Sequence, residues 1–325
     1  MALEFSGKRI LVTGVAGFIG SHLARALLDR GSEVIGVDAL TDYYDPARKR
    51  RNLESVLGEK TFRFFEEDLN RVEFSRLPVP DIVFHEAAQA GIRASWGGSF
   101  QRYVEDNILA TQRLLEAVGR WGRIERFVFA SSSSVYGDQN RLPLSEDMVP
   151  NPISPYGVTK LAAERLVFSY ARRLEMPAFA LRYFTVYGPR QRPDMAIERF
   201  FEAALRGEAV ELYGDGSQSR DFTFVDDVVE ANLLCLESGG PGGVYNIGGG
   251  VVTTMTDLIK EIRRVSERKI EVRKRETAPG DVRHTLADTS RAREDLGFAP
   301  KTTLKEGLRR QWDWIREDVA ERGLL

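Results

Sequence analysis

Residues 8–20 read Lys8-Arg9-Ile10-Leu11-Val12-Thr13-Gly14-Val15-Ala16-Gly17-Phe18-Ile19-Gly20. An apolar strand runs here into Gly-x-x-Gly-x-x-Gly, and an amphipathic helical stretch follows. In such a turn the first glycine allows the tight bend, the second lets the backbone approach a pyrophosphate, and the third permits close packing of helix on strand. The phosphate charge would lie at the helix N-terminus. The stretch predicts a dinucleotide site, against the alternative of a glycine turn in an α/β domain that binds no nucleotide.

The next strand indicates which dinucleotide is bound. Glu33–Asp38 ends in an acid, and a carboxylate at this place accepts the adenosine ribose hydroxyls and repels a 2′-phosphate. We therefore predict NAD as the cofactor rather than NADP. The predicted contacts from the two strand ends are Gly14, Ala16, Gly17, Phe18, Ile19, Gly20 and Asp38.

Short apolar runs alternate with longer amphipathic segments as far as residue 182. The runs are Arg9–Thr13, Glu33–Asp38, Phe62–Phe65, Asp81–His85, Arg126–Ala130 and Ala178–Arg182. This rhythm is typical of βαβ units, and it predicts an α/β fold with a doubly wound parallel (Rossmann) sheet. Loops rich in Gly and Pro then indicate a smaller, interleaved C-terminal substrate domain.

Two later runs, Arg220–Val225 and Val244–Gly248, are apolar enough to rejoin the main sheet on either side of a helix at Asp226–Glu237. We therefore expect residues 1–182 plus about 219–248 to form the NAD-binding domain. Residues 183–218 plus 249–325 would form the nucleotide-sugar-binding domain.

Ligands of doubly wound sheets bind outside the carboxyl ends of the strands. Asp68 and Leu69 follow the third strand and would meet the adenine. Small residues after the fourth strand, Ala87 and Ala88, would lie beside the pyrophosphate. Asn107, in the helical stretch Phe100–Arg120, is either a surface amide or a cofactor ligand.

Composition narrows the possible partners. The chain has 325 residues, 42% of them apolar, and a formal net charge of −2, which gives no reason to expect nucleic acid or an acidic membrane. No apolar run approaches the length of a membrane span, and no leader precedes the first strand, so we expect a soluble, cytoplasmic protein. Cys235 is the only cysteine, which excludes an intrachain disulfide.

Two further groups of charged or titratable residues receive structural interpretations. His22, His85 and His284 are too scattered for a metal site, so no metal is predicted, and His22 is expected to be structural. The basic run Arg48-Lys49-Arg50-Arg51 follows Asp45-Pro46 and is interpreted as a solvated helix face.

The residues that suggest chemistry lie in the middle of the chain. Ser131-Ser132-Ser133-Ser134 is followed by Tyr156 and then by Lys160. A phenol with a pKa near 10 is a poor base. An ammonium at i+4 on the same helix would favour its ionised form, and Ser132 would hold a substrate hydroxyl in line. The alternative, a chance pair on a helix surface, is disfavoured by the glycine turn in the same chain.

Taken together, the motifs resemble the extended short-chain dehydrogenase/reductase enzymes that modify nucleotide sugars, over nearly the whole chain. The motifs are Thr13-Gly14-x-x-Gly17-x-x-Gly20, His85-x-Ala87-Ala88, Ser131-Ser132-x-x-Val135-Tyr136-Gly137, Tyr156-x-x-x-Lys160, Arg182-Tyr183-Phe184-x-x-x-Tyr187-Gly188, Gly214-Asp215-Gly216, Arg220-Asp221-Phe222 and Pro279-Gly280-Asp281.

The resemblance implies specific roles. Tyr156 would be the base, Lys160 its electrostatic partner and a cofactor ligand, and Ser132 the residue that positions the hydroxyl. Tyr183 would join the cofactor contacts. The nucleoside diphosphate would be held by Tyr213, Arg220, Asp281 and Arg283. Ala278 stands where several relatives carry arginine, which leaves Arg283 or Arg275 to meet the diphosphate. The family also implies a homodimer through the helices at Phe100–Arg120 and Pro155–Arg173.

Positions 133 and 134 limit the chemistry within that family. In the 4,6-dehydratases the pair at these two positions looks like Asp-Glu. The UDP-glucuronate decarboxylases carry glutamate at the position before that of Val135. Here the pair is Ser133-Ser134, which offers no carboxylate to eliminate water or assist loss of carbon dioxide. The cysteine nucleophile of the 6-dehydrogenases is also absent. NAD-dependent epimerisation at C4 of a UDP-sugar remains.

Other stretches look like UDP-glucuronate 4-epimerases, among them Asp42-Tyr43-Tyr44 and the loop after Thr185. The expected substrate contacts are Ser133, Ser134, Thr185, Gln89, Arg93 and Arg192. The neutral hydroxyls would cradle the C6 carboxylate. Two alternatives stay open: a UDP-glucose 4-epimerase of the same fold, and a module that senses a dinucleotide without turnover.

Overall fold

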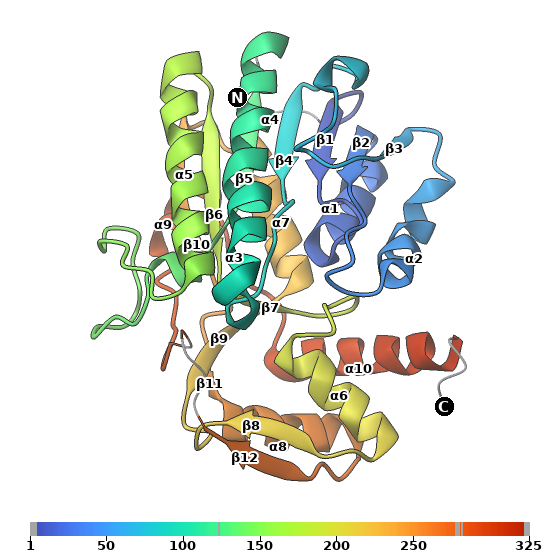
Figure 1. Ribbon diagram of the computed structural model, residues 1–325, viewed down its shortest axis with the longest axis vertical. Coiled ribbons are helices and arrows are strands. Elements are labelled where there is room, and N and C mark those ends of the chain that lie inside the picture. Colours follow the sequence, from blue (N-terminus) through green and yellow to red (C-terminus); the bar gives the residue numbers. More distant parts are fainter. Residues whose placement is uncertain (1–4, 123, 277–279, 281, 322–325) are drawn as a thin grey trace.

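The chain is built around one parallel sheet, as the sequence predicts. The computed structural model describes residues 5–122, 124–276, 280 and 282–321, and within these ranges the main sheet has seven strands in the order β10-β6-β5-β4-β1-β2-β3 (Figure 1). The strands are β1 (Arg9–Thr13), β2 (Glu33–Asp38), β3 (Phe62–Glu66), β4 (Ile82–His85), β5 (Arg126–Ser132), β6 (Ala178–Tyr183) and β10 (Gly242–Ile247). Each paired neighbour is parallel, and the strand order reverses beside β1, where ligands bind in such sheets.

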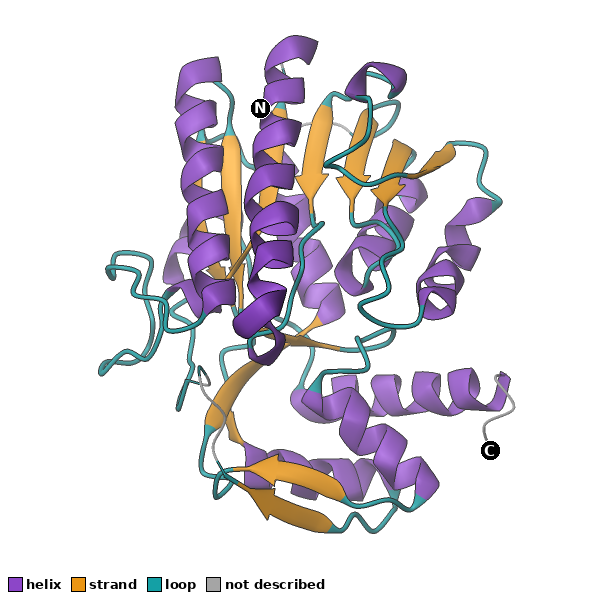
Figure 2. Cartoon of the chain, in the orientation of Figure 1, coloured by secondary structure: helices purple, strands orange, loops and turns teal. Residues whose placement is uncertain are grey.

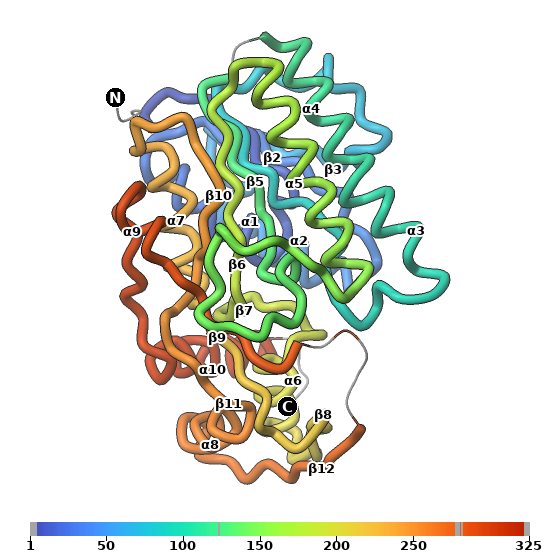
Figure 3. The backbone as a smooth tube through the Cα atoms, turned by 90° about the vertical axis from the view of Figure 1, so that its left-hand side faces the viewer, coloured from blue at the N-terminus to red at the C-terminus, as the bar shows by residue number. Residues whose placement is uncertain are grey.

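Helices cover both faces of the sheet (Figures 2 and 3). One face carries α3 (Phe100–Tyr103), the π-helical segment η4 (Val104–Leu109), α4 (Ala110–Trp121) and α5 (Pro155–Leu174). The other face carries α1 (Phe18–Asp29), α2 (Pro46–Leu57), α7 (Val225–Glu237) and α9 (Ser290–Leu296). Short 3₁₀ turns lie in the connections: η1 (Phe74–Arg76), η2 (Arg93–Ser95), η3 (Gly97–Ser99) and η5 (Ser133–Val135). None of the described helices is long and apolar enough to span a membrane.

A smaller lobe lies beyond the carboxyl ends of the strands, at the bottom of Figure 1. Its helices and strands are α6 (Ala196–Arg206), α8 (Met255–Ser266), α10 (Leu304–Glu321), β8 (Val210–Tyr213) and β12 (Val272–Arg275). A second sheet, with the order β11-β9-β7, connects this lobe to the main sheet. Its strands are β7 (Thr185–Tyr187), β9 (Ser219–Phe224) and β11 (Val252–Thr254).

The position of β9 corrects the sequence prediction. The run at Val244–Gly248 does join the main sheet as β10, parallel to β6, but the run at Arg220–Val225 does not. The buried Asp221 explains the difference, because its carboxylate accepts hydrogen bonds from the backbone N–H groups of Gly249 (2.7 Å), Gly250 (3.1 Å) and Ala287 (3.0 Å). These bonds fix β9 against the loop after β10, where it pairs with β7 and β11 instead.

The basic run at 48–51 is a solvated face only in part, since Arg50 is exposed but two of its neighbours are not. Arg48 and Lys49 are buried, on the same side of α2 as Leu53 and Val56. The Arg48 guanidinium pairs with Glu198 of α6, which is fully buried, and with Glu202 at 3.3 Å. Burial raises the pKa of Glu198, whereas the Arg48 charge and the Gln311 bond lower it. The ion pair therefore connects the main domain to the smaller lobe.

A buried amide pair extends this contact. The Gln311 side chain of α10 donates to Glu198 at 3.0 Å and to Gln191 at 2.9 Å, and its oxygen accepts from the backbone N–H of Gly188. Three segments that are distant in sequence are thus held together by polar groups that have no access to water. Buried networks of this kind are costly to leave half satisfied.

We predict that Arg48→Leu destabilises the fold by about 3 kcal/mol, because it leaves the Glu198 carboxylate buried without its main counter-charge. Urea denaturation followed by circular dichroism measures the change. Arg50→Leu is the matched control, since Arg50 lies on the same helix in an exposed pair with Glu66 at 3.0 Å. That control should change stability by roughly 0.5 kcal/mol or less. Equal unfolding midpoints for the two variants would contradict the prediction.

Candidate active site

A cleft of about 620 Å³ opens at the carboxyl ends of the main-sheet strands. It is lined by most of the residues that the sequence predicts as cofactor contacts and by the two central catalytic candidates. These are Gly14, Gly17, Phe18, Ile19, Gly20, Asp38, Asp68, Leu69, Ala87, Ala88, Gln89, Tyr156, Lys160, Tyr183 and Arg192. The fold therefore gathers into one cleft residues from both halves of the chain.

The glycine turn has no room for side chains. Gly14 has φ of +68°, and a Cβ on it would lie 2.7 Å from the backbone nitrogen of Ala87. A Cβ on Gly20 would lie 2.2 Å from the Gly14 carbonyl oxygen. Helix α1 begins directly after Gly17, so its free N–H groups point toward the cleft. The turn thus fits a pyrophosphate, with the helix N-terminus to balance its charge.

Asp38 ends β2 at the edge of the same cleft. Its carboxylate accepts from the N–H groups of Ala16 (3.0 Å) and Leu40 (2.8 Å), so the contribution of Ala16 is to fix this carboxylate. Burial raises the pKa of Asp38, while the Leu40 N–H and the charge of Lys49 lower it. Lys49 lines the cleft, with its ammonium 2.8 Å from the Thr41 carbonyl oxygen and 4.7 Å from the centre of the Tyr44 ring.

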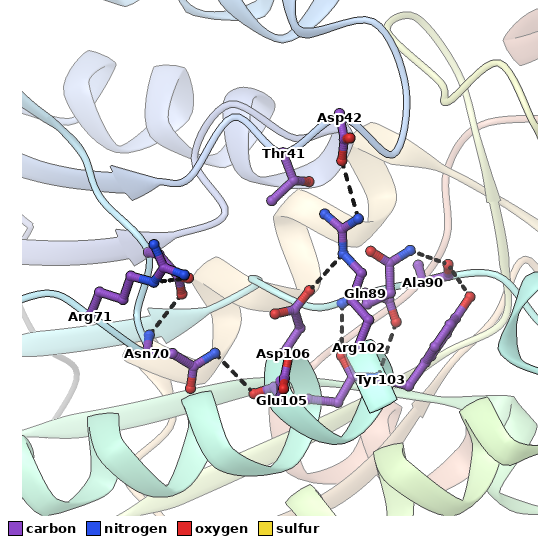
Figure 4. A network of polar contacts seen from close by, with 12 residues as sticks. Thr41, Asp42, Asn70, Arg71, Gln89, Ala90, Arg102, Tyr103, Glu105 and Asp106 are labelled. Carbon is purple, nitrogen blue, oxygen red and sulfur yellow. Dashed lines mark hydrogen bonds and ion pairs between the residues drawn. The ribbon is translucent and has the colours of Figure 1, made fainter. Parts of the chain in front are cut away.

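Polar contacts at the rim hold the loops of this cleft together (Figure 4). The Arg102 guanidinium bridges Asp42 at 3.1 Å and Asp106 at 3.4 Å. The Asn70 amide donates to the Glu105 carbonyl oxygen at 3.1 Å, which ties the loop after β3 to η4. The segment at 104–109 is therefore anchored to the loops after β2 and β3.

Asn107 holds the loop after β4. Its side-chain oxygen accepts from the Gln89 N–H at 2.7 Å, and its amide donates to the Gln89 carbonyl at 3.0 Å and to the Thr159 hydroxyl at 2.9 Å. The side chain is buried, and these partners take up its oxygen and both of its N–H groups. It is therefore not a surface amide, and it acts by positioning Gln89.

Tyr156 lies near the N-terminus of α5, which Ser154 caps with a 3.1 Å bond from the Gly157 N–H. Burial raises the pKa of the Tyr156 phenol, whereas interaction with the Ser132 hydroxyl and the charge of Arg192 lower it. Arg192 is held by Asp194 through bonds of 2.9 and 3.0 Å, and Tyr43 donates to the same carboxylate at 3.2 Å. Arg192 is thus a cation that favours the ionised phenol.

Lys160 lies one helical turn after Tyr156 on α5 and lines the same cleft. Its ammonium lies 4.5 Å from the centre of the Phe129 ring on β5. Burial lowers the pKa of Lys160 to about 8, and the carboxylates of Glu86 and Glu164 raise it. The spacing i, i+4 puts both side chains on one helix as predicted, and the action of the ammonium on the phenol stays a prediction.

Glu164 is itself tied to two strands. It accepts from the Arg182 guanidinium at 3.0 and 2.7 Å and from the Ser131 hydroxyl at 2.7 Å. The two charged side chains are almost entirely buried, and the Arg182 guanidinium lies 4.7 Å from the centre of the Tyr136 ring. This cluster fixes α5 against β5 and β6, and with it the position of Tyr156.

The predicted substrate contacts lie toward the smaller lobe. The Arg93 guanidinium is 3.9 Å from the centre of the Tyr213 ring, so these two are brought together. Arg220 donates to the carbonyl oxygens of Ser219 at 2.9 Å and Arg283 at 3.2 Å. Arg275 pairs with Glu211 at 2.7 Å. Asp281 and Ala278 lie outside the described residues.

Ser133, Ser134 and Thr185, the three hydroxyl residues expected to hold the sugar carboxylate, come from two separate segments of the structure. Ser133 and Ser134 form the 3₁₀ turn η5, where the Ser134 N–H donates to the Ser132 hydroxyl at 3.2 Å. Thr185 begins β7 and is partly buried. Their role toward a sugar stays a prediction.

The histidines have protein partners. His22 is 2.9 Å from the Pro189 carbonyl oxygen, and burial lowers its pKa to about 4, as a structural role requires. His85 lies between the hydroxyls of Thr13 (2.7 Å) and Thr111 (2.9 Å). In the part of the chain that the structure describes, His, Cys, Asp and Glu side chains form no group suited to a metal ion.

Comparison with known proteins agrees with this geometry. The model of the NAD dependent epimerase/dehydratase family matches residues 10–248. The chain belongs to this family. NAD is therefore its cofactor. The glycine turn and Asp38 line the cleft, and their chemistry fits this cofactor.

Several members are similar over almost their whole length. The UDP-glucuronic acid 4-epimerase of Bacillus cereus, solved with UDP-glucuronic acid and NAD, is 40% identical with a TM-score of 0.92, covering 95% of this chain and 99% of that one. MoeE5, solved with the same two ligands, is 44% identical with a TM-score of 0.87 and the same coverage. The uncharacterized UDP-glucose epimerase YtcB of Bacillus subtilis is 44% identical over 308 residues, or 92% of this chain and 95% of its own length.

Sequence reasoning missed several residues that line the cleft, among them Lys49, Arg102 and Glu86. Lys49 was interpreted only as part of a basic run. Its spacing of four residues before the buried Leu53 places both on the same side of α2, which is the signal that could have identified it. Glu86 directly follows the wholly buried strand β4, and an acid at that place is itself a signal. Arg102 gave no signal beyond an ordinary helical arginine.

We predict that Asp38→Ala narrows the preference for NAD over NADP by roughly tenfold, because it removes the charge that repels a 2′-phosphate and leaves that of Lys49. Titration of the purified protein with each dinucleotide measures both affinities. The double variant Asp38→Ala/Lys49→Met should lose the gain toward NADP. Equal affinities for the two dinucleotides in the unmodified protein would refute the role of Asp38.

A second prediction concerns pH. Because Arg192 lowers the pKa of the base, Arg192→Gln should raise it, and the ascending limb of kcat/KM should move to higher pH by roughly 1. A pH–rate profile with a UDP-sugar measures the shift. Arg190→Gln is the control, since Arg190 faces a separate cavity with His22 and bonds Ser55 at 3.3 Å. An unmoved limb in Arg192→Gln would show that Arg192 does not act on Tyr156.

Proposed function

We propose that the protein epimerises UDP-glucuronate at C4 to give UDP-galacturonate, through a 4-keto sugar. The observation that carries this proposal is the partly buried Tyr156 phenol near Ser132 and Arg192, in the cleft that fits NAD. Ser133 and Ser134, which directly follow Ser132, carry no carboxylate. This part of the site therefore has no acid or base that could eliminate water from the sugar. The similarity to the epimerase of Bacillus cereus supports the choice of sugar.

The residues divide the reaction between them. NAD, when bound, supplies the acceptor and then the donor of the hydrogen at C4. Tyr156 takes the O4 proton as general base and returns it as general acid after the sugar has presented its other face. Ser132 holds O4 toward the phenol. Arg192 stabilises the phenolate between the two proton transfers, because it carries a permanent positive charge.

The nucleotide would stay bound while the sugar turns. Tyr213 and Arg93 offer an aromatic face and a guanidinium for the nucleobase end, and Arg220 and Arg283 lie together near the same lobe. The planar guanidinium of arginine can donate two parallel hydrogen bonds to the oxygens of a diphosphate. Asp281 is proposed as a further contact on the strength of the family motif. Rotation of the sugar about an anchored diphosphate would present the opposite face of C4 for the return of the hydrogen, which inverts the configuration at that carbon alone.

UDP-glucose is the second candidate substrate. MoeE5 has been solved with UDP-glucose as well as with UDP-glucuronic acid, and YtcB is named for UDP-glucose. A sensing module without turnover is disfavoured, because Tyr156, Lys160 and Ser132 are all present and the first two line the cofactor cleft. A module of that kind has no use for a phenol beside a cation.

The deciding experiment incubates the purified protein with UDP-glucuronate and with UDP-glucose separately and identifies the products by NMR. We expect UDP-galacturonate from the first and slower or absent turnover of the second. Tyr156→Phe should keep its affinity for NAD and lose at least about 10²-fold in rate, because no other group takes the O4 proton. Faster turnover of UDP-glucose would reverse the assignment, and near-normal turnover in Tyr156→Phe would remove it from the mechanism.

The hydroxyl cradle can be tested in the same assay. With a carboxylate on C5, the intermediate is a β-keto acid and loses carbon dioxide when that bond aligns with the carbonyl π system. If Ser133, Ser134 and Thr185 hold the carboxylate out of alignment, Thr185→Ala should yield some UDP-4-keto-pentose at saturating substrate. A variant that is slow but gives only the C4 epimer would exclude the cradle.

We also propose that the protein works as a homodimer in the cytoplasm. Leu109 and Val158 support a paired surface, since these apolar side chains of η4 and α5 are 45% and 47% exposed on the face that the family uses. Sedimentation equilibrium that gives the mass of one chain would exclude the dimer.

A further inference from the structure

Glu86 is the one acidic side chain of the cleft that borders Lys160, and the proposed mechanism does not use it. It follows β4 directly, in the position between His85 and Ala87. The Tyr183 hydroxyl donates to its carboxylate at 3.0 Å, and the Asn232 amide donates to that hydroxyl at 2.8 Å. The carboxylate is thus held at a fixed place in the wall.

Charged and titratable groups from three neighbouring elements surround Glu86. Lys160 of α5 faces it across the cleft and is also influenced by Glu164, while Tyr183 of β6 and Cys235 of α7 adjoin it from the other side. Burial raises the pKa of Glu86 to about 7, and the Tyr183 bond and Lys160 lower it. Above neutral pH the carboxylate is therefore mostly ionised.

The cleft has two chemically different ends. Asp38 and Asp68 mark the end that suits the adenosine, next to β2 and β3. Glu86 lies at the other end, with Ser131, Tyr156 and Lys160. The nicotinamide must reach this end if it is to meet a sugar beside Tyr156. The nicotinamide ring is positively charged when oxidised and neutral when reduced, so a fixed charge in the wall acts on the two forms unequally.

We propose that the Glu86 carboxylate shifts the preference of the site toward the oxidised cofactor, by offsetting the charge of the Lys160 ammonium. An ammonium alone in this wall would favour the neutral, reduced ring. A paired carboxylate restores the balance and keeps the resting protein ready to accept hydrogen from a sugar. The proposal depends on NAD as cofactor and is independent of which sugar is the substrate.

The test is a competition between NAD⁺ and NADH for the full-length protein at pH 8, with no sugar present. The protein is equilibrated with mixtures of the two, and the bound fraction of NADH is measured by fluorescence, which gives the ratio of the two dissociation constants. Glu86→Gln should shift that ratio toward NADH by about tenfold. Glu86→Asp, which keeps the charge, should stay within about threefold of the unmodified protein. If the glutamine variant does not fold, Glu86→Leu replaces it with the same expectation.

Glu67→Gln is the matched control. Glu67 also lines the cleft, at the adenosine end, so its loss should change the two affinities together and leave the ratio unchanged. A Glu86→Gln protein whose affinities for NAD⁺ and NADH change equally would overturn the proposal, because a merely structural side chain has that effect. Since no sugar is used, this result is separate from any failure to epimerise UDP-glucuronate.

Discussion

The buried cluster of Glu164, Arg182 and Ser131 is the interaction on which the active site most depends. One carboxylate bonds a guanidinium on β6 and a hydroxyl on β5, and it comes from the helix that carries Tyr156 and Lys160. Removing one partner of such a pair typically costs about 3–5 kcal/mol, because the other charge is left buried. The cluster therefore fixes the rotation and the height of α5 on the sheet, which hydrophobic contacts alone leave less well defined.

A buried ion pair likewise fixes the position of the two lobes relative to each other. Apolar packing between them is continuous, since one cluster of buried side chains runs from β1 and α1 through α7 to α6, α8 and α10. Within that apolar cluster, the pair of Arg48 with Glu198 sets the alignment. The lobes are thus not independent bodies joined by a linker. The cleft between cofactor and nucleotide contacts is held by directional bonds on both sides.

Much of the fold follows from local patterns, and the exceptions have physical causes. The strands beside the glycine turn are predictable because each is an apolar run bounded by turn residues. The run around Phe222 and Phe224 is equally apolar, yet the bonds that Asp221 makes with residues far along the chain decide its place. In the active site, Tyr156 is found from its motif. Arg192 is predicted from the sequence as a substrate contact, but its influence on Tyr156 emerges only from the structure, because 36 residues separate the two in sequence.

The π-helical segment at Val104–Leu109 has a consequence for the loops of the cleft. A π turn contains one residue more than an α turn, and here the widened turn exposes the Glu105 carbonyl to Asn70 and directs the Asn107 side chain to Gln89. Deleting one residue would restore a regular helix at little local cost. Because a π turn and an α turn each close about one revolution, the segment on the N-terminal side, Tyr103 included, would keep nearly the same orientation relative to α4. The loss would fall instead on the bonds of Asn70 to the Glu105 carbonyl and of Asn107 to Gln89, so the extra residue serves the loops of the cleft more than the helix itself.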